Sequence, residues 1–130
     1  MDDVLAAALA PVLADVRATG APEPRVVASD WTADPALPAA MLWSADGSGV
    51  GMFVRAAEMP AARAVHASEQ VQDWVLEELP GVHAVWPPCP AHAAAHSLSP
   101  VLVDGVARWV CASDRVVIAA IGELGTTRAS

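Results

Sequence analysis

The chain has 130 residues, which fits one domain of ordinary size with a core of its own. Its formal net charge is −8 and its few basic residues are scattered. It therefore lacks the basic surface that nucleic acids and anionic membranes require. The N-terminal stretch opens with Asp2 and Asp3 rather than with the positive charges of a secretory signal. No apolar run reaches the ~20 residues of a membrane span, so we expect a cytoplasmic protein with reduced thiols.

Apolar residues recur at three- and four-residue intervals from Val4 to Val16, which predicts an N-terminal amphipathic helix. Gly20 is a natural end for this helix, and Pro11 is expected to kink it or divide it in two. Short runs rich in β-branched and other apolar residues then predict strands, two of them joined by a Gly-rich turn over residues 46–49. These predicted strands are Arg25–Ser29, Met41–Ser44 and Val50–Arg55.

A second, longer helix is predicted from Pro60 to Leu79, because proline suits a first turn and Pro80-Gly81 ends the pattern. Its apolar face includes Trp74, which we expect in the core. The acidic residues of its other face predict a solvated surface rather than an acid–base pair. That acidic set is Asp73, Glu77 and Glu78.

The C-terminal part predicts four short strands and a tail. Asp104-Gly105 between apolar runs is a strong hairpin signal. The predicted strands are Val82–Trp86, Val101–Val103, Val106–Val110 and Val116–Ile121, followed by a fraying tail over Gly122–Ser130. The chain is thus expected to be one α+β domain over residues 1–130, with an N-terminal helix, an antiparallel or mixed sheet, a long central helix and a C-terminal hairpin.

Both cysteines and two of the four histidines fall close together, as Cys89, His92, His96 and Cys111. The order Cys-x2-His-x3-His-x14-Cys has the short spacings by which a chain supplies soft ligands in pairs to tetrahedral zinc. A hairpin turning at residues 104–105 returns its far end beside its beginning, which would bring Cys111 to the first pair. The pattern predicts one zinc ion in a zinc-knuckle hairpin within residues 82–121.

Two other interpretations of the cysteines stay open: a disulfide, or ordinary buried thiols with surface histidines nearby. His66 and His83 lie outside the cluster and are expected to be surface or hydrogen-bonded histidines, His83 at the start of a strand. Trp86 and Trp109 flank the ligands and are expected to shield the thiolates from water, or alternatively to form an exposed aromatic patch.

The same region resembles a motif shared by a group of small uncharacterised proteins of high-GC Gram-positive bacteria. The likeness covers roughly the last third of the chain and implies that the four ligands belong to one motif, but it implies no catalytic residue. In that group proline often follows the last cysteine, where this chain has Ala112. The matching residues run Trp86-Pro-x-Cys-Pro-x-His-x3-His-x-Leu98, Leu102-Val-Asp-Gly, Trp109-Val-Cys111 and Ile121-Gly-Glu-Leu124.

Three functions are compatible with these features. The first is a non-enzymatic accessory protein that binds another protein and whose zinc is structural. The second is a small zinc-dependent hydrolase with an open metal site, in which Asp114 or water takes the place of His96. The number of protein ligands separates the two, because catalytic zinc keeps a position for water. The third, a DNA-associated regulator, rests on finger-like spacing alone and is opposed by the charge of −8.

Overall fold

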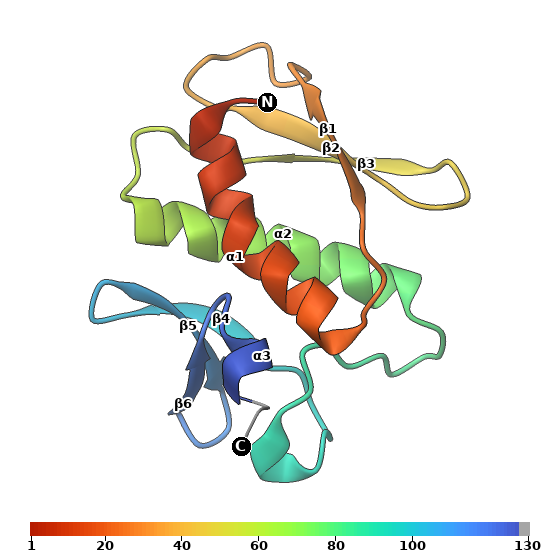
Figure 1. Ribbon diagram of the computed structural model, residues 1–130, viewed down its shortest axis with the longest axis vertical. Helices are drawn as coiled ribbons and strands as arrows, with labels where there is room; N and C mark the ends of the chain where they lie inside the picture. The colour runs from red at the N-terminus through yellow and green to blue at the C-terminus, as the bar shows by residue number, and fades with distance from the viewer. Residues whose placement is uncertain (128–130) are drawn as a thin grey trace.

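The computed structural model describes residues 1–127. Two antiparallel three-stranded sheets enclose a pair of crossing helices, one sheet above the helices and one below in Figure 1. The α+β class and the N-terminal helix predicted from the sequence are confirmed. Within residues 1–127 the strands form two separate sheets, and none of these strands pairs in parallel. The elements are α1 (Asp3–Thr19), β1 (Arg25–Ser29), β2 (Ala39–Trp43), β3 (Gly49–Phe53), α2 (Pro60–Glu78), a 3₁₀ turn (Pro90–His92), β4 (Ser99–Val103), β5 (Val106–Cys111), β6 (Val116–Ala120) and α3 (Leu124–Thr127).

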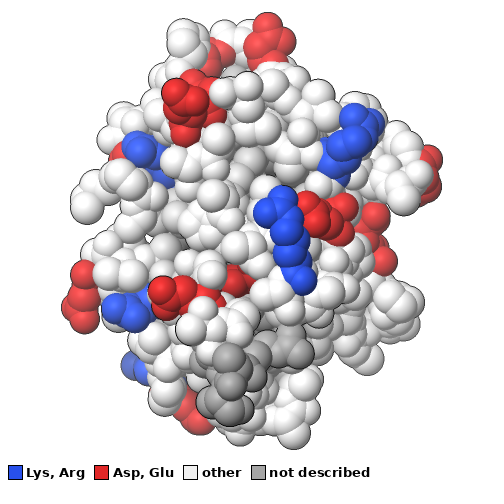
Figure 2. Space-filling model, viewed as in Figure 1, with Lys and Arg blue, Asp and Glu red and all other residues white. Residues whose placement is uncertain are grey.

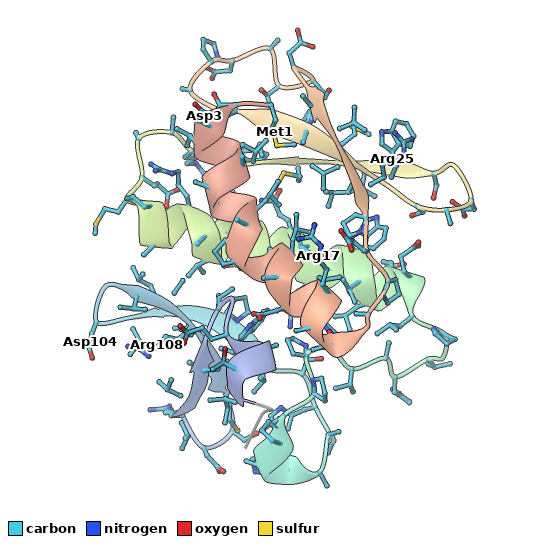
Figure 3. All side chains as sticks on the ribbon, viewed as in Figure 1. Met1, Asp3, Arg17, Arg25, Asp104 and Arg108 are labelled. Atoms are coloured by element: carbon cyan, nitrogen blue, oxygen red, sulfur yellow. The ribbon has the colours of Figure 1, made fainter. Side chains whose placement is uncertain are left out.

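Helix α1 is capped at both ends. The Asp2 carboxylate accepts hydrogen bonds from the first backbone amides, and Gly20 ends the helix with φ +71°. Asp3 in the first turn and Arg17 in the last, both labelled in Figure 3, match the helix dipole. The predicted division at Pro11 is wrong, because the helix runs unbroken through it. Buried apolar residues before and after the proline outweigh the one hydrogen bond it cannot make.

A tryptophan from the loop before β2 covers the outer face of the N-terminal sheet. The Trp31 indole Nε1 lies 3.2 Å from the carbonyl oxygens of both Ala40 and Met52, to which it donates. A Cβ atom added at Gly51 would lie 2.7 Å from the Trp31 ring. The register of β2 with β3 continues unbroken past Gly51. Glycine here therefore provides room for the indole.

Helix α2 lies between the two sheets and contributes Val71, Trp74 and Val75 to the core. The predicted core position of Trp74 is confirmed, since only 5% of this residue is exposed. Among the described residues, no helix is long and apolar enough to cross a membrane.

Two predictions for the C-terminal region are wrong. Residues 82–86 form turns and bends instead of a strand, because Val82 is 93% exposed and the described part of the chain offers this segment no neighbouring strand to pair with. The expected fraying tail is instead ordered as far as Thr127. It forms α3, whose Leu124 is buried and donates its backbone N–H to the Asp15 carboxylate. Residues 128–130 of the predicted tail lie outside the described residues.

Candidate metal centre

A compact loop between α2 and β4 carries Cys89, His92 and His96. The Cys89 amide donates to the His96 carbonyl, and the Ala94 amide donates to the Cys89 carbonyl, both at 3.0 Å. Ala93 and Ala94 have φ values of +51° and +64°, in the left-handed region that reverses a chain sharply. These bonds fold the loop back on itself and aim its side chains at one point.

Cys111 reaches the same point from the end of β5. The pairing of Ser99 with Val110 sets Cys111 level with the last residues of the loop. Its carbonyl accepts a hydrogen bond of 2.7 Å from the Arg115 amide, which closes the turn to β6. Cys111 Sγ lies 3.5 Å from His92 Nδ1, so the end of β5 brings this cysteine beside the loop.

The four side chains form a cluster of tetrahedral dimensions. One ligand atom from each of Cys89, His92, His96 and Cys111 lies within 4.8 Å of all the others. Three of the four sulfur-to-nitrogen distances are 3.6, 3.5 and 3.8 Å, and the two imidazole nitrogens are 3.0 Å apart. Zinc with bonds of ~2.3 Å to sulfur and ~2.05 Å to nitrogen holds S and N about 3.5 Å apart and two nitrogens about 3.3 Å apart. The cluster can therefore hold such an ion.

The outer nitrogen of each histidine has an acceptor. His96 Nδ1 lies 3.0 Å from the Ser97 carbonyl, and His92 Nε2 lies 3.2 Å from the Asp114 carboxylate. A carbonyl and a carboxylate can accept hydrogen bonds from the two outer nitrogens, and a neutral imidazole that donates from its outer nitrogen has a lone pair on its inner nitrogen. The inner nitrogens, His92 Nδ1 and His96 Nε2, face each other at 3.0 Å, a spacing that two ligands of one metal ion can adopt. Asp114 thus faces the outer side of His92, where it orients the ring, and it does not replace a ligand.

The loop is tied to α2 at both of its ends. The Gln72 side-chain amide donates to the carbonyls of Trp86, at 2.9 Å, and Leu98, at 2.7 Å. Trp86 and Trp109 meet edge to face with ring centroids 5.7 Å apart, and both are buried. The alternative of an exposed aromatic patch at these two tryptophans is therefore wrong.

Burial differs between the two kinds of ligand. Cys89 and Cys111 are 0% exposed, whereas His92 and His96 are half-buried at the rim. The two cysteines are not disulfide-bonded. The alternative of buried thiols with unrelated surface histidines does not fit either, because the histidines face the sulfurs.

The remaining histidines stay apart from the cluster. His83 lies in an exposed turn and does not begin a strand. His66 lies on α2 with its ring edge-on to Phe53, at 5.2 Å between centroids. Its Nδ1 is buried without a hydrogen-bond partner among the described residues, which differs from the expected surface or hydrogen-bonded histidine.

The sequence reasoning missed Asp15 and Gln72, which position the site. Asp15 is fully buried and accepts hydrogen bonds from Trp109, Gly122 and Leu124. The sequence did contain an indication of the role of Asp15, since this residue falls on the apolar stripe of α1 beside Val16. A carboxylate on such a stripe indicates buried donors elsewhere in the chain.

Comparison of the chain with protein-family models, with curated proteins and with solved structures found no match. The geometry of the cluster is therefore the basis for assigning a function.

Proposed function

We propose that Cys89, His92, His96 and Cys111 bind one zinc ion that stabilises the fold, in an accessory protein that acts by binding another protein. The observation that carries the metal is the convergence of two imidazole nitrogens, 3.0 Å apart, and two cysteine sulfurs, all four atoms lying within 4.8 Å of one another. Two thiolates and two neutral imidazoles form a ligand set that suits zinc.

A structural role follows from the number and origin of the ligands. Four protein ligands fill a tetrahedral shell and leave no position for a reactive water. Three of them belong to the loop and the fourth to β5, so the ion would join the loop to the C-terminal sheet. This arrangement disfavours the hydrolase alternative, for which one ligand would have to leave.

The partner is proposed to be a protein and neither nucleic acid nor membrane. The net charge of −8 opposes binding to phosphates. Two of the seven basic residues are also paired with glutamates, Arg17 with Glu23 and Arg55 with Glu58. On the face shown in Figure 2, acidic and basic side chains are interspersed and form no basic patch. These features also oppose the DNA-regulator alternative.

The test is the metal content of freshly purified, tag-free protein, measured by elemental analysis after desalting. We expect one zinc per chain. Replacement by cobalt should give the visible absorption of tetrahedral Co²⁺ together with sulfur-to-metal charge transfer. A chain without stoichiometric metal, or a disulfide between Cys89 and Cys111, would refute the structural zinc. A five-coordinate spectrum with exchangeable water would instead support the hydrolase alternative.

A further inference from the structure

Strand β3 forms one edge of the N-terminal sheet and has an open stretch of backbone. Among the described residues only β2 pairs with it. The Val54 amide donates a hydrogen bond to the Pro38 carbonyl, and the Ser44 amide donates one to the Ser48 carbonyl. The backbone groups of the even-numbered residues of β3 therefore face β2. The peptide groups of Gly49, Gly51 and Phe53 therefore point away from the sheet.

One of these edge positions is already filled by a side chain. The Gln70 amide oxygen accepts from the Phe53 N–H at 3.1 Å, and its amide nitrogen donates to the Phe53 carbonyl at 2.7 Å. This pair of bonds imitates a neighbouring strand. The peptide groups of Gly51 have no such partner among the described residues. Strand β3 also contains no proline and no charged residue, the usual means of blocking an edge.

A groove of about 380 Å³ runs beside the open stretch, between β3 and α2. Apolar lining comes from Val50, Met52 and Trp74, while Asp73, Glu77 and Glu78 supply carboxylates. These three acidic residues form no ion pair with any described residue. Gln70, Asp73 and Glu77 lie on one face of α2. The carboxylates of Asp73 and Glu77 therefore follow Gln70 along the open edge of β3.

We propose that β3 binds an extended segment of a partner protein as a fourth strand at Gly49–Gly51, with Lys or Arg side chains of that segment against Asp73, Glu77 and Glu78. Hydrogen bonds between the two backbones would supply affinity and the groove would supply specificity, as in other cases of strand addition. The inference rests on the protein-binding part of the proposed function and names the class of partner. A second copy of this chain is disfavoured, because pairing two β3 edges would bring two acidic rows together.

The probe is a fluorescein-labelled heptapeptide in which Thr alternates with Lys, Val and Arg, titrated with the full chain and followed by fluorescence anisotropy. We expect saturable binding that weakens with salt, and none for the analogue with Glu in place of Lys and Arg. The double variant Asp73→Asn/Glu77→Gln should bind roughly fivefold more weakly. Glu69→Gln, on the same helix but outside the groove, should bind as the unaltered protein does.

Two N-methylated versions of the peptide test the strand geometry. Methylation of the Thr amides blocks one edge of the peptide, and methylation of the alternate amides blocks the other. We expect one version to bind like the parent and the other to lose about tenfold or more. No binding of the parent at millimolar protein, equal binding of both versions, or no effect of the double variant would each overturn the proposal. Zinc content is measured on the same samples, so loss of zinc and loss of peptide binding are separate outcomes.

Discussion

The buried Asp15 carboxylate of α1 accepts a hydrogen bond of 2.7 Å from the indole Nε1 of Trp109, which is 94 residues away on β5. The same carboxylate accepts from the backbone amides of Gly122 and Leu124, at 2.7 and 3.0 Å. Three donors from the C-terminal sheet and its exit thus converge on one side chain of the first helix. This contact fixes α1 to the strand that carries the ligand Cys111.

We expect Asp15→Asn to lower the free energy of unfolding by about 3 kcal/mol, because an amide cannot accept at both positions and buried donors lose their partner. Urea denaturation followed by circular dichroism measures the change. Asp30→Asn is the control, because Asp30 is exposed and its side chain has no hydrogen bond with the described residues. Equal stability of the two variants would contradict the role assigned to Asp15.

Cys89→Ser should abolish stoichiometric zinc, because serine is a poor ligand and the other three cannot close the shell. His83→Ala should keep the metal, since His83 lies in an exposed turn outside the cluster. Elemental analysis after desalting distinguishes the two variants. Chelation of the unaltered protein should speed hydrogen exchange in residues 86–121 while α1 and α2 stay protected. Zinc retained by Cys89→Ser would count against the assigned ligand set.

Asp114→Ala should weaken zinc affinity by about ten- to hundredfold without changing the stoichiometry at saturating metal, because the carboxylate orients the His92 ring. Competition with a chromophoric chelator measures this affinity. Ser113→Ala changes the neighbouring exposed residue of the same turn and should bind zinc normally. If Asp114→Ala lost one ligand and opened the coordination shell, Asp114 would be a ligand instead of an orienting group.

Gln72→Glu should destabilise the loop, since it places an oxygen against the carbonyls of Trp86 and Leu98 where the amide donated. We expect a loss of about 2 kcal/mol in the free energy of unfolding. Zinc affinity should also fall, because the loop that carries three ligands is held by these two bonds. Glu69→Gln, a change on the exposed face of α2, is the control. Unchanged zinc affinity in Gln72→Glu would show that the two Gln72 hydrogen bonds do not help to position the metal ligands.

Features encoded in nearby residues were predictable from the sequence. The periodicity from Val4 to Val16 predicted α1, because burial of one helical face repeats every three or four residues. The spacing of Cys89, His92 and His96 predicted that they would face one point, since a short turn determines where its own side chains aim. The position of Cys111 was also predictable, because the Asp-Gly turn determines the register of its hairpin.

Only the tertiary structure decided the features that join distant parts of the chain. An apolar run at 82–86 looks like a strand, but a strand requires a neighbour, and here the chain instead turns at exposed Val82. Asp15 finds its donors on β5 and in the residues leading into α3, and no local pattern records a partner so far away. The same holds for the outer nitrogen of His92, whose acceptor Asp114 lies across the site in the turn after β5. The sequence by itself determined which residues could bind a metal, whereas long-range packing decided their orientation and hydrogen-bond partners, because these depend on groups that meet only after the chain has folded.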